Sequence, residues 1–393
     1  MNFLNEAKTL MRQNIREYGM YIALVVIMIT FSIATDGLFL SPRNISNLIN
    51  QTGYIAVLAI GMTLVIVIRH IDLSVGFLSG FLGAIGAIML TKMGFPVYVA
   101  IPLILIFGIL IGVINGFLIA QLNIPAFVAT LAGWLIFRGL LLWVTEKTGT
   151  IIIDDKYFNA IGNGFIPDIA NFENFHLLTL IIGAIGILFF IRNELRTRKL
   201  KIKYDFDVIS MNILLIKIVF VSIAIAYITW ILAGYNGLSW TIVIVAATAA
   251  IYHFITTTTI LGRHIYALGG NPEAAKLSGV NVKKITYTVF CSMGLLSALS
   301  GILFASRLQS ATTTAGTLFE LDAIAAAYVG GVSAAGGVGK VTGSLIGALV
   351  MASLVSGMNL MGVGIYFQYI IRGAVLVIAV IFDVTTRNSV KSV

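Results

Sequence analysis

Long, continuous apolar runs constrain this chain more than any other feature, because they recur from Tyr21 to Phe382 with little polar interruption. Such runs can cross a lipid bilayer only as helices or closed β-barrels, since no water is present there to satisfy backbone N–H and C=O groups. Barrel strands alternate apolar and polar residues, whereas these runs are apolar throughout. We therefore predict an all-α polytopic membrane protein.

Composition supports the same interpretation. Hydrophobic residues make up 59% of the 393 residues, and charged residues make up only 10%. A soluble globular domain contains about 25% charged residues, so a chain this poor in charge could not cover a surface in contact with water. We therefore interpret residues 1–393 as a single transmembrane domain rather than as several soluble domains.

A membrane span requires about 20 apolar residues. The sequence predicts about 12 helical segments, near residues 19–35, 48–68, 74–92, 97–121, 124–145, 176–192, 211–233, 239–261, 283–306, 319–332, 340–357 and 365–383. Segment 319–332 is too short to cross a bilayer comfortably by itself. We expect it to form a partial helix that is buried within the bundle.

The distribution of Lys and Arg predicts the orientation. Basic residues gather in loops 192–210 and 262–282 and in the N-terminal segment 1–18, whereas connection 146–175 carries more acidic than basic residues. Cytoplasmic loops of membrane proteins carry the excess of Lys and Arg. We therefore expect both termini and the two basic loops in the cytoplasm, and 146–175 outside. The net charge of +9 is then explained without a nucleic-acid partner.

Many of the glycines within the predicted spans are four residues apart, which places them on one helix face. These sets are Gly108, Gly112 and Gly116; Gly76 and Gly80; and Gly339, Gly343 and Gly347. Small residues on one face allow helix backbones to approach closely. We interpret these sets mainly as contacts for tight packing of a large bundle.

No motif supports chemistry at phosphate or metal. The Gly-rich stretch 336–340 lacks the pattern of a phosphate-binding loop, because Ala334 and Val341 occupy the positions that require Gly and Ser or Thr. The four histidines, His70, His176, His253 and His264, share no ligand spacing, and the single cysteine has no partner. We predict no enzyme activity, and no cofactor, ATP or metal bound by this chain itself.

The polar stretch within 262–282 has the pattern of a short capped helix. Pro272 stands at a first helical position after Asn271 as the cap, Glu273 lies in the first turn, and Gly279 ends the helix. By its residues alone, such a helix is either a docking element for a cytosolic partner or an ordinary loop helix.

Several stretches together resemble a known family. They are 71–76 (IDLSVG), 266–279, 321–326 (LDAIAA), 330–339 (GGVSAAGGVG), and the residues around 362–364 and 372–373. In these stretches the chain resembles the permease subunits of ATP-binding-cassette sugar importers of the ribose and xylose branch. The additional helical pair around 176–233 is typical of the xylose-type members. The chain departs from the family at Arg69 and His70, where two glycines are more common.

The resemblance implies a fold similar to that of type II importer permeases, in a bacterial cytoplasmic membrane. It implies a homodimer with the translocation path between its copies, a cytosolic ATPase with two nucleotide-binding domains that uses the ATP, and an extracytoplasmic sugar-binding protein. Cargo would be a monosaccharide such as D-xylose. The coupling helix that contacts the ATPase would comprise Asn271, Pro272, Glu273, Ala274, Ala275, Lys276, Leu277, Ser278 and Gly279.

Other polar residues are candidates for the family signature or for a sugar path: Asp72, Ser74, Gly76, Asn115 and Asp322. Asn115, Gln121 and Gln368 could line a path or bond across helices. Among charged residues in the spans, Arg138 and Lys217 could extend to an interface, and Arg372 also lies in an apolar run.

Two alternative functions stay open at this point. One is a related importer for another cargo, such as an autoinducer-type furanose or a branched-chain amino acid. The other is a proton-coupled transporter that works alone and needs buried acidic groups near mid-membrane. In the early chain only Asp72 could serve as such a group, and it lies at the end of a span.

Overall fold

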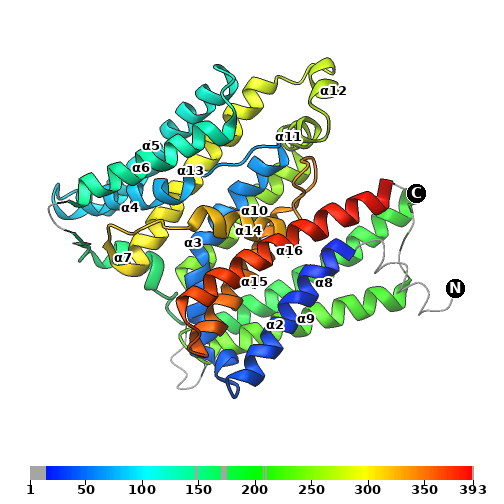
Figure 1. Ribbon diagram of the computed structural model, residues 1–393. Helices are drawn as coiled ribbons and strands as arrows, with labels where there is room; N and C mark the ends of the chain where they lie inside the picture. Colours follow the sequence, from blue (N-terminus) through cyan, green and yellow to red (C-terminus); the bar gives the residue numbers. More distant parts are fainter. Residues whose placement is uncertain (1–14, 147–148, 170–174, 207, 209, 392–393) are drawn as a thin grey trace. The chain divides into compact units, whose positions relative to one another are not determined.

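The computed structural model describes residues 15–146, 149–169, 175–206, 208 and 210–391, and nearly all of its regular structure is helical (Figure 1). The chain divides into two compact units. The smaller comprises Leu40–Asn47 and Phe165–Ser239 with the start of the chain, and the larger comprises the rest. We describe each unit by itself.

The smaller unit is built on two antiparallel helices, α8 (Leu177–Lys203) and α9 (Met211–Ala233). Near one end, a side chain at Gly183 of α8 would overlap Thr229 of α9, so the two backbones approach closely there. Farther along, Lys217 Nζ of α9 lies 2.7 Å from Glu194 Oε1 of α8. Lys217 therefore pairs with a carboxylate, an arrangement that its position in an apolar run did not indicate.

Helix α8 is longer than the sequence predicted. We expected a helix near 176–192 followed by a loop, but α8 continues through the basic residues to Lys203. Basic side chains can project into water from a helix as readily as from a loop, and no Gly or Pro interrupts this stretch.

The remaining elements are, in chain order, α2 (Ile15–Ala34), η1 (Leu38–Leu40), α3 (Pro42–Val67), α4 (Val75–Thr91), α5 (Val97–Ala120), α6 (Ala126–Thr145), β1 (Ile151–Ile152), α7 (Lys156–Asn163), α10 (Trp240–Thr258), α11 (Ile260–Gly270), α12 (Pro272–Leu277), α13 (Val282–Leu308), β2 (Ser310–Ala311), α14 (Phe319–Val329), α15 (Val341–Leu360) and α16 (Ile365–Lys391). Strands β1 and β2 pair antiparallel, with Ile151 opposite Ala311. The sequence had not predicted α7 or this small sheet.

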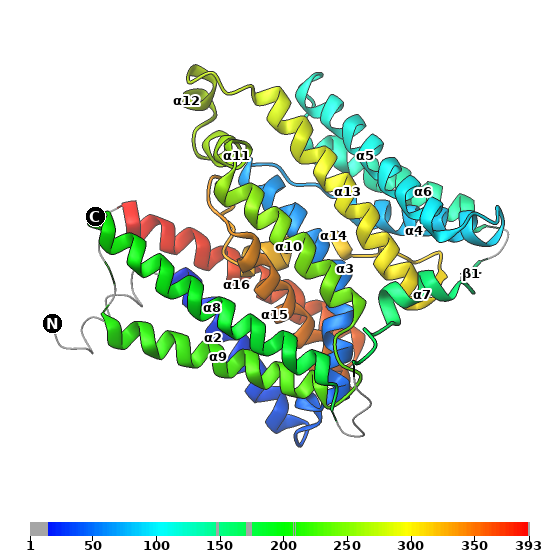
Figure 2. The same ribbon diagram turned by 180° about the vertical axis from the view of Figure 1, so that it is seen from behind.

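Helix α13 forms the centre of the larger unit and packs beside α4 and α5 (Figure 2). Where α13 meets α5, Gly294 and Gly108 face each other so closely that a Cβ atom on either would overlap the other's carbonyl oxygen. Where α13 meets α4, a Cβ atom on Gly83 would lie 2.9 Å from the carbonyl oxygen of Gly301. The prediction that glycine faces serve close helix packing is therefore confirmed.

Helix α14 is only 11 residues long. At about 1.5 Å per residue it is roughly 16 Å long, about half the thickness of a hydrocarbon core. Its backbone lies directly on α15, where a side chain on Gly343 or Gly347 would overlap the backbone at Gly330 or Ala326. The prediction of a short, buried helix in 319–332 is confirmed.

All 12 expected segments are helical in the described chain. Nine helices are long and apolar enough to cross a membrane, and two shorter apolar helices cover Gly19–Ala34 and Val75–Thr91. Helix α14 is the twelfth. This shows a polytopic helical membrane protein, whereas the number of crossings and the cytoplasmic position of both termini stay predictions.

Candidate functional site

The short helix expected after Gly270 is present as α12, and its cap is the predicted one. Asn271 Oδ1 accepts a hydrogen bond of 3.0 Å from the backbone N–H of Ala274, and Pro272 stands at the first helical position. Gly279 follows the helix with φ of 84°, in the left-handed region that glycine adopts without strain. The sequence pattern alone was sufficient here, because caps act through local bonds.

Helix α12 presents a mixed surface to solvent. Ala275 is buried, whereas Glu273, Ala274 and Lys276 are exposed. Leu277 is 89% exposed, the highest value among the large apolar side chains of the described chain. A rigid, capped helix that offers an apolar side chain among charged ones has the composition of a protein contact.

A compact backbone junction lies beneath α12 and joins α11 to the end of α3. Arg69, just after α3, donates from Nε to the carbonyl oxygen of Gly269 and from Nη2 to that of Gly270, each at 2.6 Å. The N–H of Gly337 donates to the carbonyl oxygen of Val67 at 2.9 Å. The last two carbonyl groups of α11 therefore accept hydrogen bonds from the side chain of Arg69. The last carbonyl group of α3 accepts one from the glycine-rich loop.

Glycine is required at this junction for space. A Cβ atom on Gly269 would lie 2.6 Å from the nitrogen of Gly337, and one on Gly336 would lie 2.8 Å from the oxygen of Val67. Tyr266 adds a hydrogen bond of 2.6 Å from its hydroxyl to the oxygen of Gly339. The stretch 336–340, which does not fit a phosphate loop, thus serves as a packing surface for the backbone of α11 and α3.

Arg69, where the resemblance led us to expect a glycine, has an unusual backbone conformation. Its φ of 67° lies in the left-handed region, which glycine adopts freely and other residues rarely. The arginine fits this backbone conformation and adds two hydrogen bonds that a glycine could not make. The sequence marked the position as unusual, but only the fold shows what the side chain contacts.

Three of the predicted signature residues form one buried network at the start of α4. Asp72 Oδ1 accepts hydrogen bonds from the Ser74 N–H at 2.9 Å and from the Ser74 hydroxyl at 2.6 Å. Asn115 of α5 donates from Nδ2 to Ser74 Oγ at 3.3 Å. Asp72, Ser74 and Asn115 are 2%, 0% and 5% exposed, so their visible role is to order the start of α4 and join it to α5.

The other two signature residues, Gly76 and Asp322, lie outside this network and have different partners. Gly76 lies against Glu320, whose Oε1 accepts a 3.0 Å hydrogen bond from Trp134 Nε1 and whose Oε2 has no hydrogen-bond partner in the described chain. Asp322 pairs with Arg372 of α16, at 3.4 Å between Oδ1 and Nη1. Asp72, Ser74 and Asn115 therefore share one network, whereas Gly76 and Asp322 each contact other residues. The place of all five on a sugar path stays a prediction.

Sequence reasoning did not identify Glu320 or Trp134. A carboxylate inside an apolar segment was a usable signal, because ionisable groups within a membrane are costly and are mostly functional. Glu320 stands two residues before Asp322 in the same short helix. The contact with Trp134 could not be inferred, because the two residues are 186 positions apart.

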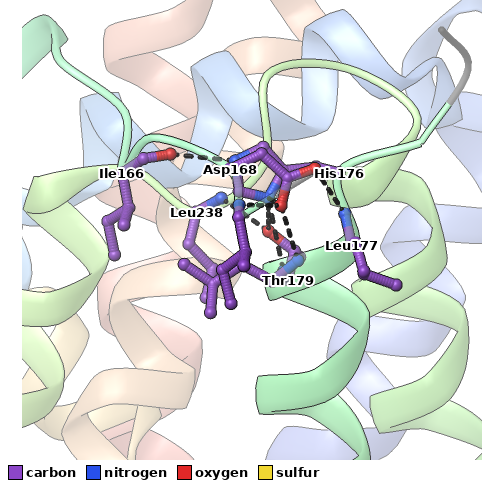
Figure 3. Close-up of polar contacts among 8 residues, drawn as sticks. Ile166, Asp168, His176, Leu177, Thr179 and Leu238 are labelled. Atoms are coloured by element: carbon purple, nitrogen blue, oxygen red, sulfur yellow. Dashed lines mark hydrogen bonds and ion pairs between the residues drawn. The ribbon is translucent and has the colours of Figure 1, made fainter. Parts of the chain in front are cut away.

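A third polar cluster orders the connection that precedes α8, as Figure 3 shows. Asp168 accepts hydrogen bonds from the backbone N–H groups of Leu177 at 2.7 Å and Leu178 at 2.8 Å, in the first turn of α8. His176 caps the same turn through Nδ1, which accepts from the Thr179 N–H, and its Nε2 donates to the oxygen of Ile166 at 2.8 Å. The loop is thus tied to the helix N-terminus.

These contacts predict a dependence on pH. Burial by itself would raise the pKa of Asp168, but hydrogen bonds from backbone N–H groups, led by those of Leu178 and Leu177, lower it below its ordinary value. Because the folded loop favours the ionised form of Asp168, this carboxylate stabilises the loop fully at pH values above the ordinary aspartate pKa of about 3.9. The stabilisation is lost as the pH falls through the lowered pKa of the folded state. We expect faster amide exchange in residues 165–169 and 175–179 below about pH 4, measured by mass spectrometry after correction for intrinsic rates.

Asp168→Asn is the matched control for this experiment. Asparagine keeps an oxygen acceptor of the same shape but does not titrate in this range. The acid-dependent opening should therefore disappear in the variant. Equal acid sensitivity of wild type and variant would assign the opening to another group.

Comparison with known proteins adds the family. The family model described as the permease component of the branched-chain amino acid transport system matches residues 44–380. The xylose transport system permease protein of Haemophilus influenzae is 40% identical over 95% of this chain and 98% of its own length. Its counterpart in Escherichia coli is 38% identical over 95% of this chain and 93% of that protein.

A ribose permease also matches over most of its length. The ribose import permease protein of Haemophilus influenzae is 35% identical over 93% of each chain. No solved structure matches the chain significantly.

Proposed function

Since this chain belongs to the family of permease components of branched-chain amino acid transport systems, we propose that it is the membrane permease of an ATP-driven importer for D-xylose or a related aldose. The observation that carries the proposal is the identity with xylose permeases over nearly the whole chain, which exceeds that with the ribose permease. The match covers 95% of this chain, so it does not rest on a short shared segment alone.

We assign α12 as the contact with a separate ATPase subunit. The support is its capped geometry, its exposed Leu277 and its direct continuation into the junction at Arg69. A partner that binds two permease states with different affinity can shift their populations. The junction offers a route for this shift, because the end of α11, which leads directly into α12, is in close backbone contact there with α3 and with Gly337 of the glycine-rich loop.

The proposed complex has two further parts. A second copy of this chain would complete the translocation path, and a sugar-binding protein would deliver the cargo on the side of the connection 146–175. In this arrangement both termini and α12 face the cytoplasm of a bacterium. ATP is hydrolysed by the partner ATPase, and this chain supplies the path and the coupling surface.

The test is uptake of D-xylose by proteoliposomes that contain this permease with its ATPase and binding protein. We expect uptake to require all three proteins and ATP. Leucine and D-ribose, each offered with a binding protein that recognises it, are the comparison cargoes.

The same preparation separates the alternatives. Uptake by the permease alone in response to a pH gradient would contradict ATP-driven transport and favour a secondary transporter. Import of leucine in preference to the pentose would place the chain with amino-acid importers instead.

A further inference from the structure

The ion pair between α14 and α16 is open rather than closed. Nη1 of Arg372 lies 3.4 Å from Oδ1 and 3.5 Å from Oδ2 of Asp322, whereas a charge-assisted N–H···O bond is about 2.7–2.9 Å long. The Nε atom of Arg372 has no hydrogen-bond partner in the described part of the chain. One donor of this pair, Arg372 Nε, is therefore left unused, although unsatisfied polar groups are costly within a membrane protein.

The pair lies where two hollows of the larger unit meet. One hollow of about 60 Å³ is lined by Gln51 and Tyr54 of α3, and the other, of about 320 Å³, by Tyr369 of α16. Asp322 and Arg372 line both hollows. The larger hollow reaches the lower end of the range of about 300–1,000 Å³ that is typical of small-molecule sites. The smaller hollow has room for only a few water-sized groups, so it can take a hydroxyl of a ligand but not a whole sugar.

The chemistry of this position suits a polyhydroxyl ligand. Each sugar hydroxyl is both a donor and an acceptor, so one hydroxyl can donate to the carboxylate while a neighbouring hydroxyl accepts from the guanidinium. An open pair can receive two adjacent hydroxyls without first breaking a short ion pair. Gln51 and Tyr54 add an amide and a hydroxyl on the wall of the smaller hollow.

From this geometry we infer that the Asp322–Arg372 pair binds adjacent hydroxyl groups of the sugar during its passage through the permease. The inference deepens the proposed function and rests on it, because it takes the cargo to be a pentose. Binding here is weak, since a transport path must release its cargo as well as admit it. The pair thus replaces part of the water shell of the sugar midway along its path.

The experiment compares D-xylose with its singly deoxygenated analogues in proteoliposomes of the complete complex. The binding protein is the same for every permease variant, so a change in the ratio of xylose uptake to analogue uptake reports on the permease. Removal of a hydroxyl that binds a charged group should lower uptake by roughly 10-fold to 100-fold in the wild type. In Asp322→Asn we expect this penalty to shrink by about tenfold for at least one hydroxyl position.

Two further variants keep the test decisive if Asp322→Asn folds poorly. Arg372→Lys retains the opposite charges but loses the planar fork of donors, and the double variant Asp322→Asn with Arg372→Gln leaves no unpaired charge. Arg372→Lys and the double variant should each change the ratio of xylose uptake to analogue uptake. The matched control is the ion pair of α8 and α9, where Glu194→Gln with Lys217→Met should leave the ratio unchanged.

The outcomes separate the two proposals. If wild-type complex imports xylose and every Asp322 and Arg372 variant retains the wild-type ratio, the pair is structural and this inference is wrong. If the wild-type complex imports no xylose at all while ATP and the partner proteins are present, the proposed function fails instead.

Discussion

Leu277→Asp is expected to abolish ATP-driven uptake while the permease still folds and inserts into the membrane. Leu277 is 89% exposed in the isolated chain, so the substitution removes no internal packing. Burying a leucine in a partner's pocket contributes about 1.5–3 kcal/mol, which corresponds to roughly 10-fold to 150-fold in affinity. Aspartate loses that contribution and adds the cost of burying an unpaired carboxylate.

The measurement is co-purification of the ATPase with the permease, together with its stimulation by sugar-loaded binding protein. Leu122→Asp is the matched control, because Leu122 is 53% exposed and follows Gln121, which contacts Lys283 just after α12. The Leu122→Asp permease should bind the ATPase as the wild type does. Undiminished binding by Leu277→Asp would remove α12 from the docking surface.

A variant at Arg69 separates docking from transmission. Arg69→Ala loses both hydrogen bonds to the end of α11 but leaves the surface of α12 unchanged. We expect it to bind the ATPase normally and to import less sugar per ATP hydrolysed. Loss of ATPase binding in this variant would show instead that the junction only supports the shape of α12.

Gly294→Ala is expected to destabilise the folded permease, although it adds a single methyl group. The new Cβ atom would overlap the carbonyl oxygen of Gly108 and lie 3.0 Å from the nitrogen of Gly112. These are backbone atoms in a helix, so α5 and α13 must move apart along their crossing. Overpacking of this kind costs about 1–3 kcal/mol, and separation of the two helices adds to that loss.

Gly139→Ala, the matched control, is expected not to destabilise the folded permease. No atom lies within 4 Å of the position that its Cβ atom would take in α6. Because alanine is a better helix former than glycine, this variant should unfold no more easily than the wild type. Both variants are compared by unfolding of purified protein in detergent micelles with increasing denaturant. If Gly294→Ala unfolded at the same denaturant concentration as the wild type, the contact between α5 and α13 would tolerate expansion.

Local patterns in the sequence were sufficient for features that depend on neighbouring residues. Apolar runs located the helices, because a span must satisfy its own backbone hydrogen bonds. The boundaries of α12 could be predicted from Asn271, Pro272 and Gly279, because capping interactions form within one helical turn. The continuation of α8 to Lys203 was missed because basic residues are compatible with both helix and loop.

Contacts between distant residues could not be inferred in this way. Arg69 is 200 residues from Gly269, and Trp134 is 186 residues from Glu320. Asp322 was singled out as a signature residue and Arg372 as a charge in an apolar run, but nothing local indicated that they form a pair. The five signature residues likewise do not form one site, because Gly76 contacts Glu320 of α14 and Asp322 pairs with Arg372 of α16.

The sequence by itself determined that this chain is a bundle of membrane helices with a capped, polar helix after Gly270. These properties follow from hydrophobicity and from hydrogen bonds within single segments. Only the tertiary structure decided which residues the glycines and buried charges contact, because their partners come from remote segments. It brings Arg69, the end of α11 and the glycine-rich loop into one junction, and it places Asp322 beside Arg372 between two hollows. A residue pattern can report that a backbone must approach closely or that a charge must be paired, but only the fold specifies the partner.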